Sequence, residues 1–246
     1  RTDKLYVKRF EEETNLRSQI IVDVSSSMNF PQENDQVSKR DFSFVCAAAL
    51  AEMLRKQKDA IGLTLYSSKV EKHIRPKSSK THFKFLIDEM EQEMNSAQEG
   101  KETSSVEVLH EIAEQIHPRS LVILFTDLLD INSEDSEFRL NELLDAVQHL
   151  KHKRHEVIIF HVAHDRFEKD FELPKRPLKL VDVETGEEVK VEVNEVKDYY
   201  VNKVQSYFQN IKDEMGNRKI DFIQVDVEKK PEQVLLPFLL KRSKMF

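Results

Sequence analysis

Two apolar runs that end abruptly in polar side chains constrain the fold of this chain more than any other feature. Ile20–Val22 and Leu121–Phe125 contain no polar residue, which is typical of strands that are covered on both faces of a sheet. Strand-like segments alternate with helical patterns along almost the whole chain. This alternation predicts an α/β fold with a mostly parallel sheet and helices on both faces.

The other elements follow from apolar spacing and turn residues. Strands expected at 61–66 and 70–74 are joined by three residues, so we expect them to pair as one antiparallel edge of the sheet. Residues 178–183 and 188–193 flank a turn that contains Gly186, which predicts a hairpin excursion over 178–193. Further strands are expected at 5–10, 156–162 and 220–225, and helices at 38–58, 79–94, 137–152 and 198–215, after Thr103 and from Pro231.

Oxygen-bearing side chains follow the first apolar run on alternate positions. Asp23, Ser25 and Ser27 can converge on one point. Hard divalent cations prefer oxygen ligands, and open α/β sheets bind ligands at the carboxyl ends of their strands. The pattern therefore predicts a magnesium or manganese site. The alternative is that these residues only end a strand and cap a helix, since aspartate and serine are common in both roles.

Two later segments carry similar side chains. The second apolar run ends in Thr126 and Asp127, and Thr103 stands just ahead of a helical pattern. A threonine in that place has an ordinary role as a helix N-cap. Asp23, Thr103 and Asp127 are far apart in sequence, but the predicted sheet can bring all three to one edge.

Composition narrows the classes of partner. The 246 residues are 39% hydrophobic and 34% charged, so we expect one globular domain over residues 1–246. A net charge of -7 provides no basic field for nucleic acid. The single Cys46 forms no internal disulfide, which fits the cytoplasm, and no apolar run approaches the roughly 20 residues that span a bilayer. The chain begins at Arg1, so we expect the C-terminal part of a longer protein and leave an upstream membrane anchor open.

An enzymatic function finds little support. A phosphatase of the haloacid dehalogenase type would use Asp23 as its nucleophile, but it needs a second carboxylate where this chain has Ser25. A glycine-rich phosphate loop is absent from the sequence. Five histidines have spacings compatible with zinc ligands, but no cysteine joins them, and we expect them on the solvated surface: His149, His152, His155, His161 and His164.

Asp23-x-Ser25-x-Ser27, Thr103 and Asp127 together resemble the metal-ion-dependent adhesion site (MIDAS) of the von Willebrand factor type A fold. The resemblance implies a Rossmann-like sheet in which the serines and the threonine approach the cation. The two aspartates would hold the cation directly or through water. That fold usually has two glycines before the threonine, whereas this chain has Gly100-Lys101-Glu102, so the loop is expected to hold Thr103 less rigidly.

Within that fold the chain is similar to the bacterial domain-of-unknown-function family 58. The similarity is carried by Arg1–Lys8 with Phe10–Glu13, Asp23–Met28, Asp182–Glu187 and Pro237–Leu239. It implies a non-enzymatic, metal-dependent protein-interaction domain whose partners are a MoxR-type AAA ATPase or other von Willebrand factor type A proteins. The alternative is a metal-free scaffold that keeps a relic of the site.

Overall fold

A computed structural model describes residues 16–31, 36–96, 105–128, 136–174, 176–181 and 188–243. Thr103, the strand expected at 5–10 and the turn of the predicted hairpin lie outside these residues. Two of the segments that carry the family resemblance, Arg1–Glu13 and Asp182–Glu187, lie outside them as well.

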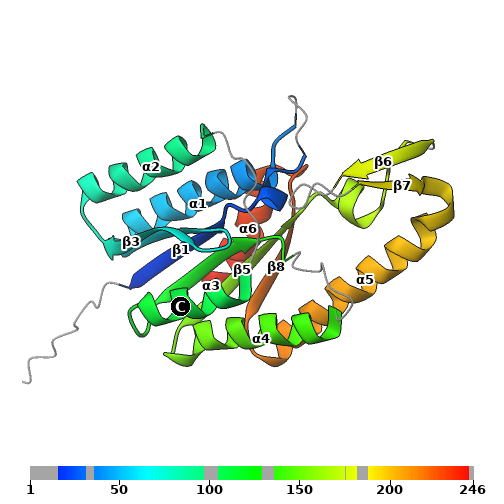
Figure 1. Ribbon diagram of the computed structural model, residues 1–246. Helices are drawn as coiled ribbons and strands as arrows, with labels where there is room; N and C mark the ends of the chain where they lie inside the picture. Colours follow the sequence, from blue (N-terminus) through cyan, green and yellow to red (C-terminus); the bar gives the residue numbers. More distant parts are fainter. Residues whose placement is uncertain are drawn as a thin grey trace, which may run out of the picture.

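The central sheet has the strand order β3-β2-β1-β4-β5-β8 (Figure 1). Its strands are β1 (Arg17–Asp23), β2 (Ala60–Tyr66), β3 (Val70–Lys77), β4 (Leu121–Thr126), β5 (Glu156–Ala163) and β8 (Asp221–Asp226). Neighbouring strands are parallel, except that β2 and β3 are antiparallel. The predicted α/β fold with one antiparallel edge is confirmed.

The two apolar runs lie side by side at the centre of the sheet. β1 pairs with β4 in parallel, with Val22 opposite Phe125, and both side chains are buried. The strand order reverses here, because the chain moves from β1 to β2 on one side and later returns to place β4 on the other. Open α/β sheets bind ligands beyond the carboxyl ends of the strands at such a switch point.

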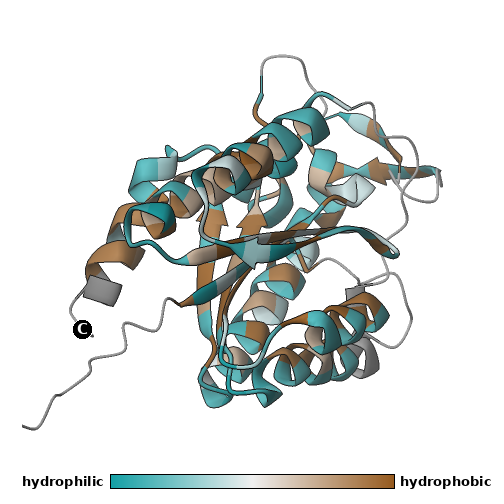
Figure 2. Ribbon diagram, turned by 90° about the vertical axis from the view of Figure 1, so that its left-hand side faces the viewer, coloured by the Kyte–Doolittle hydropathy of each residue, from teal (hydrophilic) through white to brown (hydrophobic). Residues whose placement is uncertain are grey.

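Helices cover both faces of the sheet (Figure 1). One layer holds α1 (Lys39–Lys56), α2 (Lys80–Met94) and α6 (Pro231–Ser243), and the other holds α3 (Ser105–Gln115), α4 (Ser136–His152) and α5 (Val193–Asn217). Alternate residues of β1 serve the two layers, since Ile20 packs toward α1 and Ile21 toward α3. Figure 2 shows the strands between the helices as largely hydrophobic.

The start of one helix was predicted correctly and that of another was not. Ser38 caps α1, and its hydroxyl accepts a hydrogen bond from the Asp41 amide at 3.0 Å. α5 begins at Val193 and not near residue 198. The alternating valines before it favoured a strand through residue 193, but Val193 is 3% exposed and packs as the first helical residue. Tertiary packing decides this boundary because Glu192 makes no capping bond with its side chain.

The predicted hairpin forms a sheet of its own. β6 (Pro177–Val181) pairs antiparallel with β7 (Glu188–Glu192), with Leu178 opposite Val191. It lies beside the beginning of α5, apart from the central sheet (Figure 1). Its side chains are exposed or half-buried, so the hairpin is an excursion that adds little to the core.

Two short helical turns follow strands at the carboxyl edge of the sheet. η1 (Ser26–Asn29) follows β1, and η2 (Asp165–Lys169) follows β5. The turns bring further polar side chains close to the ends of β1 and β4. Among the helices of the described residues, none is both long and apolar enough to cross a membrane.

Candidate functional site

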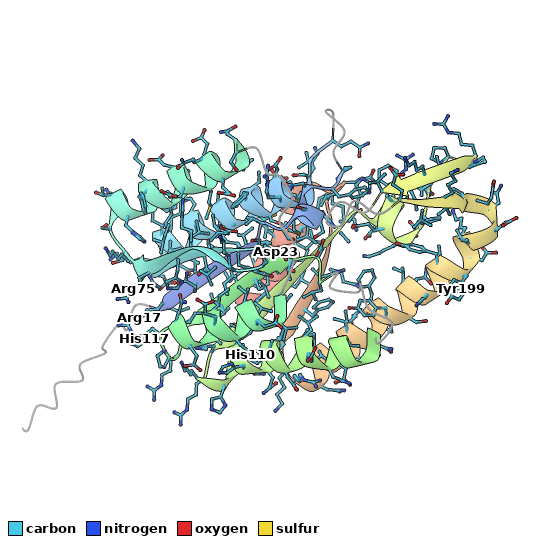
Figure 3. The ribbon with its side chains drawn as sticks, in the orientation of Figure 1. Arg17, Asp23, Arg75, His110, His117 and Tyr199 are labelled. Carbon is cyan, nitrogen blue, oxygen red and sulfur yellow. The ribbon has the colours of Figure 1, made fainter. Side chains whose placement is uncertain are left out.

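Asp23 and Asp127 lie next to each other because their strands are neighbours. Asp23 is the last residue of β1, and Asp127 directly follows β4. The exposed fractions of the two residues are 0% and 2%. Figure 3 shows Asp23 at the opposite end of β1 from Arg17. Two of the predicted ligands are therefore brought together at the carboxyl edge of the sheet.

The Asp23 carboxylate is held by neutral donors on both oxygens. Its Oδ1 accepts a hydrogen bond from the Ser25 amide at 2.9 Å. Its Oδ2 accepts from the Thr126 hydroxyl at 2.9 Å and from the Tyr66 hydroxyl at 3.2 Å. Burial and the charge of Asp23 raise the pKa of Tyr66 well above its usual value, so this phenol stays protonated and donates.

Burial of Asp23 makes its charge costly. Removal from water raises the pKa of its carboxyl from 3.8 to about 6, and the negative charge of Asp127 acts in the same direction. Hydrogen bonds from Ser25 and Thr126 oppose the rise. The site therefore holds an excess of negative charge that a cation at this edge would relieve.

The two serines face each other beyond the end of β1. Their Oγ atoms are 3.1 Å apart, and Ser25 is buried. Ser25 precedes η1 as its N-cap residue, but its side chain makes no capping hydrogen bond. The capping interpretation that the sequence left open therefore does not account for this hydroxyl.

Asp127 is held by a charge that the sequence interpretation missed. The Lys39 ammonium lies 2.8 Å from Asp127 Oδ2 and 2.6 Å from Glu168 Oε1, and its side chain is 1% exposed. Burial opposes the charged form, but Asp127 and Glu168 outweigh burial and raise the pKa of Lys39 above its usual value. Lys39 therefore remains a cation.

A sequence signal for Lys39 existed. Lysine is the first residue of α1, directly after the Ser38 cap, where the positive end of the helix dipole disfavours a cation. A lysine in that place indicates carboxylates close by. Glu168 gave no comparable signal, since it lies 129 residues further along the chain in a turn that the sequence did not predict.

The histidines of the described residues do not form a metal centre. Three of the five are buried and not on the solvated surface as expected, namely His155, His161 and His164. His161 donates from Nε2 to the Asp127 carbonyl at 3.0 Å, and burial, with a smaller effect of the Lys169 charge, lowers its pKa to about 3. His149 lies elsewhere, against His110 of α3 and Glu114. Across the described residues, no group of three or more His, Cys, Asp or Glu side chains is placed to hold a metal.

The oxygen donors present suit Mg²⁺ or Mn²⁺. Adjacent ligands of an octahedral Mg²⁺ at about 2.1 Å lie about 3 Å apart, which matches the separation of the Ser25 and Ser27 hydroxyls. Asp23 and Asp127 supply carboxylates beside them. The Lys39 ammonium shares Asp127 with any such ion, and Thr103 lies outside the described residues.

The phosphatase interpretation loses support from the same geometry. A phosphatase of this type needs a second carboxylate two residues after its nucleophilic aspartate, to act as general acid and base. The position two residues on is Ser25, whose hydroxyl contacts Ser27.

Comparison with known proteins confirms the family resemblance and the fold. A sequence profile of the family described as "Protein of unknown function DUF58" matches residues 1–207. None of the curated proteins matches the chain in sequence.

Several solved structures share the fold. The conserved hypothetical protein BatB from Bacteroides thetaiotaomicron is 13% identical with a TM-score of 0.55, and the match covers 94% of this chain and 98% of that one. An aerotolerance-related membrane protein from Bacteroides fragilis NCTC 9343, with multiple mutations to serines, is 11% identical with a TM-score of 0.52 and coverages of 90% and 98%. The PilB minor pilin from Streptococcus sanguinis is 12% identical with a TM-score of 0.59, and the match covers 96% of this chain and 62% of the pilin. At these identities the likeness shows the fold alone.

Proposed function

We propose the following function for this chain, which belongs to the family of proteins of unknown function DUF58: it is a protein-interaction domain that binds one divalent cation and engages a partner without catalysing a reaction. The observation that carries the proposal is the pair of serine hydroxyls 3.1 Å apart beside the buried Asp23. Asp127 adds a second carboxylate, and Thr103 is the fifth proposed ligand. Mg²⁺ and Mn²⁺ suit this set of oxygen donors.

The charge of the site favours an acidic group from the partner. Asp23 and Asp127 balance at most the two charges of the cation, and the serine hydroxyls are neutral. A coordination position that faces the partner therefore stays electrophilic, and an Asp or Glu side chain is its favoured occupant. We propose a MoxR-type AAA ATPase, or another von Willebrand factor type A protein, as the partner.

A second candidate is a scaffold that binds its partner without metal. The observation that favours it is the ion pair between Lys39 and Asp127, because a cation of the chain itself already neutralises one proposed ligand. The partner would then bind through another surface. The two candidates differ in whether partner binding depends on a divalent cation.

Calorimetry with Mg²⁺ and Mn²⁺ tests the metal. We expect one site in the unmodified chain and none in Asp23→Ala; because Asp23 is buried, circular dichroism verifies that this variant folds. His152→Ala, an exposed position at the end of α4, is the matched control. Absence of binding by the unmodified chain up to about 10 mM, the range of weak sites with few carboxylates, would favour the scaffold.

Affinity capture from the native source tests the partner. We expect recovery in Mg²⁺, and loss in chelator or with Ser25→Ala, while His152→Ala recovers the partner normally. Recovery of the same partner by Ser25→Ala in chelator would contradict the metal-dependent mechanism.

A further inference from the structure

We propose that Lys39 is a tethered cation that competes with the divalent metal for Asp127 and withdraws to Glu168 when the metal binds. The inference rests on the proposed metal site and names the two residues that would set its affinity. Neither residue belongs to the ligand set that the sequence predicts.

The position of Lys39 is unfavourable for a positive charge unless carboxylates lie close by. As the first residue of α1 it adds a positive charge to the positive end of the helix dipole. Its side chain is also 1% exposed, so the ammonium has lost most of its hydration. The compensation comes from Asp127 and Glu168, which accept its hydrogen bonds.

Metal and ammonium would share the charge of the same carboxylate. The Lys39 Nζ atom lies 2.8 Å from Asp127 Oδ2, on the edge of the site that holds Asp23 and the serines. A dication bound to that oxygen at about 2.1 Å would repel an ammonium in this place. The two cations therefore compete for the charge of Asp127, and each weakens the binding of the other.

Glu168 is built to receive Lys39. Its Oε2 accepts a hydrogen bond from the His164 amide at 2.6 Å, which fixes the carboxylate. Its other oxygen, Oε1, already lies 2.6 Å from Lys39 Nζ. Lys39 can therefore release Asp127 and keep its existing contact with Glu168.

The charges balance when both cations are present. Asp23, Asp127 and Glu168 carry three negative charges when ionised, which equal those of one dication and the Lys39 ammonium. In this arrangement the metal takes Asp23 and Asp127, and Lys39 keeps Glu168. In the structure the Lys39 ammonium lies between Asp127 and Glu168 and contacts both.

Calorimetric titration of the purified chain with MgCl₂ and MnCl₂ tests the competition. Lys39→Met should bind at least tenfold more tightly than the unmodified chain, because the competing charge is gone. Glu168→Gln should bind at least tenfold more weakly, because Lys39 then has only Asp127. In the double variant Lys39→Met with Glu168→Gln, the loss of affinity caused by Glu168→Gln should be smaller, because Lys39 is absent.

Lys56→Met is the matched control, since it removes the same charge from the exposed far end of α1 and should change the affinity less than twofold. Circular dichroism in chelator verifies folding. If Lys39→Met fails to fold, Lys39→Gln and the charge-balanced double variant provide the comparison.

The outcomes separate this inference from the proposed function. Equal or weaker binding by folded Lys39→Met or Lys39→Gln would overturn the competition while leaving the metal site intact. Binding by Lys39→Met but not by the unmodified chain would support the competition and contradict metal binding by the natural protein. Absence of binding in every variant would overturn both.

Discussion

Asp23 and Asp127 stand at neighbouring strand ends, yet the chain stabilises the two carboxylates in different ways. Asp23 is surrounded by neutral donors, from Ser25, Tyr66 and Thr126. Asp127 receives a full positive charge from Lys39. The neutral donors of Asp23 do not offset its burial, so its pKa stays raised, whereas Asp127 forms an ion pair with a buried ammonium. The contrast shows that burial alone does not define the electrostatic state of a site residue.

Removal of Lys39 should have the largest effect. In chelator, Lys39→Met leaves Asp127 and Glu168 without their cation, and we expect a loss of about 3–5 kcal/mol in the free energy of unfolding. Lys56→Met, at an exposed pair, should change it by less than about 0.5 kcal/mol. Urea unfolding measures both variants. A loss below about 1 kcal/mol for Lys39→Met would remove the contrast between the two aspartates.

The pH dependence of the free energy of unfolding below pH 7 should reveal the ionisation of Asp23. Its pKa of about 6 in the folded chain exceeds the ordinary 3.8, so the folded state holds the proton more tightly. Well below pH 3.8 both states are protonated; as pH rises to about 6 the unfolded chain ionises first, and stability falls by about 3 kcal/mol. Asp23→Asn should lack this fall.

The measurement is urea unfolding from pH 3.5 to 7 in chelator, with the exposed Asp145→Asn as control. The difference between the two variants isolates the contribution of Asp23. A difference curve that is flat across this range would place the pKa of Asp23 near its ordinary value.

Loss of one neutral donor should have a smaller effect. Tyr66→Phe removes only the hydroxyl that donates to Asp23, and we expect a loss of about 1–2 kcal/mol at pH 7. The pKa of Asp23 should rise further, because a hydrogen bond to its charged form is gone. Tyr199→Phe, at a residue that is 71% exposed, should change neither quantity. An effect as large as that of Lys39→Met would show that the neutral donors and the ion pair are equivalent.

Deletion of the hairpin of β6 and β7 should have the smallest effect on stability and on the two aspartates. Replacing residues 177–192 by a short Gly-Ser link removes β6 and β7, whose side chains are exposed or half-buried, and we expect a change below about 1 kcal/mol in the free energy of unfolding. Thermal unfolding measures the change. The pH dependence of stability below pH 7 should be the same as in the unmodified chain. Collapse of the folded state would mean that the hairpin covers part of the core.

Sequence patterns identified the fold because its elements carry local signals. The unbroken apolar runs of β1 and β4 predicted buried parallel strands, and Ser38 predicted the start of α1. The same patterns placed Asp23 and Asp127 at one edge. These predictions depend on short segments whose chemistry is visible without the rest of the chain.

The parts that sequence patterns missed depend on distant contacts. Lys39 and Glu168 meet across 129 residues, and although the place of Lys39 at the start of α1 indicates a carboxylate close by, no local pattern indicates that it is Glu168. The buried state of His161 arises from its place on β5 between β4 and β8. The start of α5 at Val193 likewise depends on packing and not on a capping residue.

The pairing of β1 with β4 also determines when the site is assembled during folding. The hydrogen bond from Thr126 to Asp23 joins residues 103 apart, and the ion pair from Lys39 to Asp127 spans 88. Contacts this distant form only after a large loop has closed, which is slow compared with the formation of a helix or of the β2–β3 hairpin. A nascent chain that ends before β4 has Asp23 but lacks Thr126, which donates a hydrogen bond to it, and the neighbouring carboxylate of Asp127. Assembly of the site is therefore a property of the finished sheet, and no single segment of the chain contains it.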